Sequence, residues 1–183
     1  MHSVTHIIHN AWPVDFNRNL SSLESQVKVL SNLVRLALLS ASQNFCCPAH
    51  ATQIEPKRLL FASSIAVVGR YPIVNPLGPG DVPEVELDPR CTDDFGYPEA
   101  KWVCEEILLK INEYFKDYFP SDDATFNKPL LRTSSVRIGQ MTGPEGSGAW
   151  NETEHFPIIV RTSKMVKALP QVKGVGFSLF FIF

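Results

Sequence analysis

The apolar positions of this chain follow two different periodicities. Short continuous apolar runs, typical of buried parallel strands, alternate with longer segments in which apolar residues recur every three or four positions, as on one face of a helix. In chain order the pattern predicts a strand, a helix, a strand, a helix, a strand and a helix, over residues 4–9, 20–37, 58–63, 97–118, 130–139 and 154–169.

Strands that alternate with helices in this way are typical of right-handed crossover units that share a parallel sheet. The pattern therefore predicts an α/β fold with a doubly wound parallel sheet. Two connections are long. Residues 40–57 show no periodicity, and residues 71–96 contain five prolines that are expected to form a wall beside a site.

Polar or small residues stand at the end of each predicted strand. In open parallel sheets, ligands bind outside the carboxyl ends of the strands. Those ends are occupied by Asn10 and Ala11, by the pair Ser63 and Ser64, and by Ile138 and Gly139. We therefore expect these residues to share one edge of the sheet.

Tyr97 and Lys101 lie four residues apart at the beginning of the predicted second helix, and therefore on one face of it. A tyrosine is a poor acid near neutral pH unless a neighbouring cation or hydroxyl stabilises its phenolate. We expect Lys101 to lower the pKa of Tyr97, and Ser64 to bind the carbonyl oxygen that Tyr97 protonates. Together they would stabilise a developing oxyanion.

Composition excludes some classes of function. The net charge of −2 and a pI of about 6.2 provide no basic stripe for nucleic acid. Four cysteines without C-x-x-C spacing indicate a reduced, cytoplasmic chain. We expect no secretory signal and no membrane span, because the apolar residues 174–183 are too short to cross a bilayer. Cys46, Cys47 and His50 are interpreted as an ordinary loop, and no metal site is predicted.

Four segments resemble the thioester reductase domains that end fungal nonribosomal-peptide-synthetase-like and aminoadipate-reductase-like enzymes, within the extended short-chain dehydrogenase/reductases. They read HIIHNAWPVDFN at 6–17, LFASSI at 60–65, GYPEAKWV at 96–103 and VRIGQMTG at 136–143. The resemblance covers roughly residues 4–170. It implies NADPH-dependent reduction of an acyl thioester, held on the phosphopantetheine arm of a carrier protein, to an aldehyde or an alcohol.

The resemblance also implies roles for individual residues. Three match the family's catalytic positions, and seven match positions that contact the cofactor. The catalytic positions are Ser64, Tyr97 and Lys101; the cofactor positions are His9, Asn10, Ala11, Ser63, Tyr97, Lys101 and Ile138.

The chain departs from the family in three places. The family's domain opens with a strand and a glycine-rich turn that holds the pyrophosphate, whereas this sequence starts at the equivalent of the fourth strand. We therefore expect a partial Rossmann-like sheet: residues 1–170 form the C-terminal part of the reductase domain, and residues 171–183 an atypical apolar tail. Residues 44–56 look like an insertion.

Two alternatives stay open. The chain could be a noncatalytic, truncated remnant that binds no cofactor, since loss of the pyrophosphate site removes several kcal/mol of binding. It could also be an extended short-chain dehydrogenase/reductase acting on nucleotide sugars, as an epimerase or dehydratase. The contexts of Trp12 and Trp102 match the thioester reductases better.

Overall fold

A computed structural model describes residues 4–42, 56–78, 81–118, 129–141 and 143–168. It divides the chain into two compact units, Met1–Ile138 and Gly139–Phe183, and each is described by itself. The expected tail and, apart from Pro56, the expected insertion lie outside the described residues.

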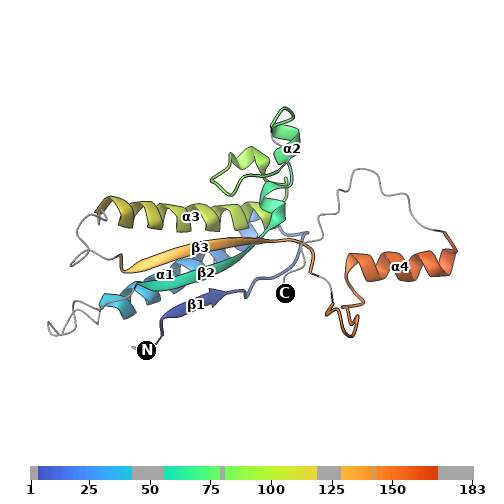
Figure 1. The fold of residues 1–183 in the computed structure, drawn as a ribbon, viewed down its shortest axis with the longest axis horizontal. Helices are drawn as coiled ribbons and strands as arrows, with labels where there is room; N and C mark the ends of the chain where they lie inside the picture. The colour runs from blue at the N-terminus through green and yellow to red at the C-terminus, as the bar shows by residue number, and fades with distance from the viewer. Residues whose placement is uncertain (1–3, 43–55, 79–80, 119–128, 142, 169–183) are drawn as a thin grey trace. The chain divides into compact units, whose positions relative to one another are not determined.

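The first unit contains a three-stranded parallel sheet (Figure 1). Its strands are β1 (His6–His9), β2 (Lys57–Ser64) and β3 (Leu131–Ile138), in the order β1-β2-β3. Helix α1 (Glu24–Ser42) lies between β1 and β2 in the chain, and helix α3 (Gly96–Tyr118) lies between β2 and β3. The prediction of an α/β fold with a parallel, partial Rossmann-like sheet is confirmed.

Short helical segments lie between the longer elements of the described residues. The proline-rich connection is not wholly irregular, because it contains two of them. The short segments are η1 (Leu20–Leu23), η4 (Ile65–Val68), α2 (Tyr71–Val74) and η5 (Pro89–Cys91). The second unit contains helix α4 (His155–Val166), which ends at Lys167 in the left-handed conformation (φ 54°).

Both long helices pack on the same face of the sheet. Leu59 and Phe61, which alternate along β2 and are fully buried, contact apolar residues of α1 and α3. The buried cluster consists of Leu30, Val34, Ala37, Leu59, Phe61, Cys104, Leu108, Phe115 and Leu131. On the other face of the first unit, the side chains of Ile8 and Val136 are 70% and 41% exposed. The core is therefore one-sided within this unit.

The first helical stretch begins with an asparagine cap. Ser21 and Ser22 are both plausible helix caps. In the structure, Asn19 occupies the cap position of η1, and its Oδ1 accepts a hydrogen bond from Ser22 N at 3.0 Å. An asparagine cap therefore starts this stretch, and the two serines lie inside it.

The beginning of α3 is fixed by a close approach between two backbones. A Cβ atom placed on Gly96, the first residue of α3, would lie 2.4 Å from the carbonyl oxygen of Arg18 and from the carbonyl carbon of Asn19. The loop that follows β1 therefore lies directly against the first turn of α3. This contact sets the position of Tyr97, the next residue.

Asn112 of α3 binds the backbone of β3 with both ends of its amide. Its Nδ2 donates to Thr133 O at 2.8 Å, and its Oδ1 accepts from Thr133 N at 2.9 Å. Thr133 Oγ1 also donates to Leu108 O at 2.7 Å. Helix α3 and β3 are therefore joined by hydrogen bonds as well as by apolar packing.

Replacing Gly96 with alanine should destabilise the first unit. Alanine gains at most about 1 kcal/mol of helix propensity, whereas a methyl group driven into backbone costs roughly 1–3 kcal/mol. We expect Gly96→Ala to lower the free energy of unfolding measured by urea denaturation. Gly146→Ala is the control, since a Cβ there meets nothing within 4 Å. Equal stability of both variants would contradict the close approach.

Candidate functional site

The carboxyl ends of the strands bring several of the predicted site residues to one edge of the sheet. In the parallel register, Ser64 pairs with Ile138 and Ser63 pairs with Arg137. His9, the last residue of β1, pairs with Phe61. Asn10 and Ala11 follow His9 and are exposed. The strand ends therefore share one rim, as expected for parallel strands.

Tyr97 lies in the first turn of α3 beside this rim. Its side chain is half-buried, and its ring packs edge-on against Phe16, with 5.2 Å between ring centroids. Burial raises the pKa of Tyr97, and hydrogen bonding with the Ser64 side chain opposes that rise. Tyr97 and Ser64, predicted to act together, therefore do meet.

The expected effect of Lys101 on Tyr97 is wrong for this structure. Lys101 Nζ lies 5.6 Å from the centroid of the Tyr97 ring, and it is directed elsewhere, donating a hydrogen bond to Ala62 O at 2.5 Å. Burial, and not a neighbouring cation, controls the pKa of Tyr97, which is raised instead of lowered. The phenol is consequently held in its protonated form near neutral pH.

Lys101 is buried in an aromatic box. Its side chain is 3% exposed, and Nζ lies 4.4 Å from the centroid of the Trp12 ring and 4.7 Å from that of Phe61. Burial lowers the pKa of Lys101 to about 8, against weaker opposite effects of Cys104 and Glu105. A lysine this close to neutrality is unusual and marks a candidate functional site.

The two serines at the end of β2 have different surroundings. Ser64 Oγ accepts a hydrogen bond from Ala66 N at 3.2 Å, which caps η4. That bond uses a lone pair and leaves the hydroxyl proton for another acceptor. Ser63 is 4% exposed, and its Oγ has no hydrogen-bond partner among the described residues. Ser64 is therefore the donor that faces Tyr97.

His9 lies inside the site instead of at its surface. It is 4% exposed and stacks on Phe61, with 5.5 Å between ring centroids. Burial, together with the charge of Lys101, lowers the pKa of His9. Its Nε2 and the Nε1 of Trp12 are buried without a hydrogen-bond partner among the described residues. Buried polar atoms are normally paired, so this interior has capacity to bind a polar group.

Sequence reasoning missed an ion pair beside the site. Arg137, near the end of β3, binds Glu105 of α3, with 2.8 Å between Nη2 and Oε2 and 3.1 Å between Nε and Oε2. Both side chains are largely buried. Glu105 stands four residues after Lys101, a spacing that would suggest pairing between those two. The structure pairs Glu105 with Arg137 instead.

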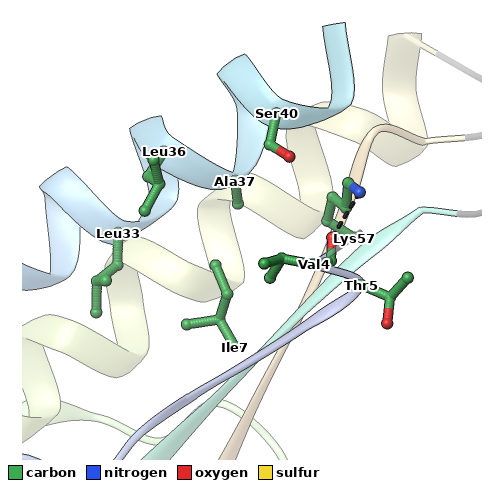
Figure 2. Close-up of a pocket in the computed structure, with 8 residues that line it drawn as sticks. All are labelled: Val4, Thr5, Ile7, Leu33, Leu36, Ala37, Ser40 and Lys57. Atoms are coloured by element: carbon green, nitrogen blue, oxygen red, sulfur yellow. Dashed lines mark hydrogen bonds between the residues drawn. The ribbon is translucent and has the colours of Figure 1, made fainter. Parts of the chain in front are cut away.

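An apolar groove in the described part of the chain lies away from Ser64, Tyr97 and Lys101. It has a volume of about 90 Å³ and lies between α1 and the beginnings of β1 and β2, lined mainly by apolar side chains such as Ile7, Leu33 and Ala37 (Figure 2). Lys57 Nζ is bound there to Val4 O at 2.6 Å. Because Val4 and Lys57 precede or begin their strands, the groove is at the end of the sheet opposite Ser64.

Two further properties concern only the described part of the chain. It holds no cluster of three or more histidine, cysteine or acidic side chains that could bind a metal ion. None of its helices combines the length and apolar character needed to cross a membrane. Cys46, Cys47 and His50 lie outside the described residues.

Comparison with known proteins identifies fungal relatives. An adenylate-forming reductase of Aspergillus terreus is 42% identical over 170 residues, which cover 92% of this chain and 14% of that protein. The non-reducing polyketide synthase fsr1 of Gibberella fujikuroi is 38% identical over 173 residues, covering 94% of this chain and 7% of the synthase. The chain is a homologue of one segment of these enzymes.

The same relationship extends to the non-reducing polyketide synthase pgmA of Aspergillus terreus, which is 34% identical over 94% of this chain and 7% of its own length. No protein-family model matches the chain. The resemblance to reductase domains of fungal adenylate-forming enzymes is confirmed. The chain spans at most about one seventh of the length of these relatives.

The buried ammonium predicts a specific pH dependence of stability. The pKa of Lys101 falls from its ordinary 10.5 to about 8 in the folded chain. Between these values the unfolded chain binds more protons, so the contribution of Lys101 to stability rises with pH. We expect the difference in free energy of unfolding, Lys101→Met minus wild type, to fall from pH 8 to pH 10.5. Urea titrations at several pH values measure it.

The control for this measurement is Lys110→Met, which removes an exposed lysine from the same helix. It corrects for the loss of one positive charge. A difference that stays constant for Lys101→Met across this pH range would contradict the burial of a charged lysine in the aromatic box.

Proposed function

We propose that this chain supplies the carbonyl-reducing site of a fungal thioester reductase. The reaction is the NADPH-dependent reduction of an acyl thioester, carried on the phosphopantetheine arm of a carrier protein, to an aldehyde with release of the arm's free thiol, or, after a second hydride and proton, to an alcohol. The observation that supports it best is the meeting of Ser64, Tyr97 and Lys101 at the carboxyl end of β2. The relationship to an adenylate-forming reductase supports the same reaction class.

The residues present fit the nicotinamide-ribose side of such a cofactor. Three buried polar atoms around the rim have no partner among the described residues: His9 Nε2, Trp12 Nε1 and Ser63 Oγ. A bound amide or ribose hydroxyl could satisfy groups of this kind. We assign its contacts to His9, Asn10, Ala11, Ser63, Tyr97, Lys101 and Ile138. When bound, NADPH supplies the hydride.

The chain's own residues provide the proton and the oxyanion contacts. Tyr97, whose raised pKa keeps it protonated, donates its phenolic proton to the carbonyl oxygen of the substrate. Ser64 donates a second hydrogen bond to that oxygen, because its lone pair already accepts from Ala66 N. The positive charge of Lys101 lies 5.6 Å from the centroid of the Tyr97 ring, and it acts on the site as a whole, not through a contact with the phenol oxygen. Each contact strengthens as negative charge develops, which favours the transition state.

Tyr97→Phe should abolish reduction without affecting substrate loading. We would place this chain in the matching segment of the Aspergillus terreus adenylate-forming reductase, which it resembles over 170 residues. Loss of the proton donor should lower kcat for NADPH oxidation by roughly 10²–10⁴-fold. Ser64→Ala should lower it by roughly 10²–10³-fold. Loading of the carrier protein, measured by mass spectrometry, should stay unchanged.

Tyr114→Phe is the matched control, since Tyr114 lies on the same helix, roughly 25 Å along its axis from Tyr97 at 1.5 Å per residue. It should retain full activity. The proposal fails if Tyr97→Phe releases product at the normal rate. It also fails if the unmodified chimera loads substrate but oxidises no NADPH.

One observation favours the noncatalytic alternative. Lys101 Nζ is bound to Ala62 O and enclosed by aromatic rings, so it contacts no ligand position in this arrangement. Cofactor binding would either move the Lys101 ammonium outward to the ligand or rely on its charge from its present position. The relatives named above favour a reductase over a nucleotide-sugar enzyme.

Titration of the purified 183-residue chain with NADPH distinguishes a segment that binds the cofactor from a noncatalytic remnant that does not. We expect saturable quenching of tryptophan fluorescence, because Trp12 lies at the rim, and we expect Trp12→Phe to reduce the signal. Lys101→Met should weaken binding, because it removes a buried positive charge close to the proposed cofactor position. Absence of saturable binding by the wild-type chain would support the remnant.

A further inference from the structure

Lys101 is a buried cation without an acidic partner. Among the described residues, no carboxylate lies within ion-pair distance of its Nζ, and Glu105, one turn further along the same helix, is bound by Arg137. One backbone carbonyl, Ala62 O, is its only hydrogen-bond acceptor in the described structure. Burying a charge with so few partners costs folding free energy. The aromatic ring faces around the ammonium therefore contribute to stabilising it.

Trp12 is the closest of the three rings to this cation. The distance from Lys101 Nζ to the ring centroid is 4.4 Å for Trp12, 4.7 Å for Phe61 and 5.6 Å for Tyr97. Tryptophan also has the strongest attraction for a cation among aromatic side chains, and this attraction grows when the pair is shielded from water. Trp12 therefore provides the largest single aromatic contribution to holding the ammonium.

The position of Trp12 is itself fixed from two sides. Its ring packs edge-on against Phe61 of β2, with 5.7 Å between centroids, and lies 6.3 Å from the ring of His9. Further along the same loop, the backbone at Arg18 lies against Gly96 at the start of α3. The loop therefore connects the strand end to the helix that bears Lys101.

We propose that Trp12 is a positioning residue for Lys101: its indole face holds the ammonium at the carboxyl end of β2, with Nζ 5.6 Å from the centroid of the Tyr97 ring. The catalytic consequence rests on the proposed function, whereas the contact itself exists without it. Trp12 is thus more than a filler of apolar space, because an aliphatic side chain of similar bulk would leave the ammonium with one carbonyl and two more distant rings.

The test measures the ammonium directly in the cofactor-free, 183-residue chain. Fluorinated tryptophan at position 12 keeps nearly the shape of the indole and withdraws electron density from its face, which weakens the attraction for a cation. The pKa of Lys101 is followed by NMR of ¹³C-labelled lysine, with the signal assigned by Lys101→Met. The substitution leaves in place the other titratable residues around Lys101, which are His9, Tyr97, Cys104 and Glu105.

We expect the pKa of Lys101 to fall below about 8, by roughly half a pH unit for trifluorotryptophan, and by less with fewer fluorine atoms. Trp12→Phe, which keeps an aromatic face, should give a smaller fall than Trp12→Leu, which does not. These substitutions provide a second series should the fluorinated chain fold poorly.

The matched control is fluorinated tryptophan at Trp102. That indole lies on α3, donates from Nε1 to Leu87 O at 3.3 Å and packs in a separate apolar cluster. It should leave the pKa of Lys101 unchanged. An unchanged pKa across the Trp12 series, or equal shifts from both positions, overturns the proposal. Because no cofactor or substrate is present, this result is independent of whether the chain reduces a thioester.

Discussion

The burial of a single ammonium group connects the parts of this site. Lys101 Nζ is bound to β2 through Ala62 O and covered by the ring of Trp12. This one atom of α3 therefore links the helix to the central strand and to the loop after β1. Moving α3 along the sheet would separate the ammonium from these contacts. The free-energy cost would be large, because the charge would stay buried without a partner. The same constraint holds Tyr97 and Ser64 together.

The electrostatic arrangement divides two cations between two tasks. Arg137 neutralises Glu105 by donating hydrogen bonds from both Nε and Nη2, a geometry for which a guanidinium is suited. Lys101 is therefore left with a net positive charge that no carboxylate cancels in the described structure. A field of this kind is useful where negative charge appears on an oxygen and disappears again, since it requires no reorganisation during the reaction.

The sequence predicts the framework of this fold because its signals are local. The apolar run that contains Leu59 and Phe61 and the helical stripe of α3 both appear in the structure close to the expected ranges. The contact between Trp12 and Lys101 could not be predicted, because no periodicity links a loop residue to a helix residue far along the chain. The direction of the Tyr97 pKa shift could not be predicted for the same reason, since it depends on how deeply the folded chain buries that side chain.

The paired hydrogen bonds between Asn112 and Thr133 give the two edges of the sheet different properties. On β3, a side-chain amide occupies backbone groups that another strand would need, whereas β1 pairs on one side only with β2 among the described strands. Exposed strand edges are templates for further pairing. An additional strand on the β3 side would therefore find the backbone groups of Thr133 already bonded, whereas the outer edge of β1 has no neighbouring strand among the described residues.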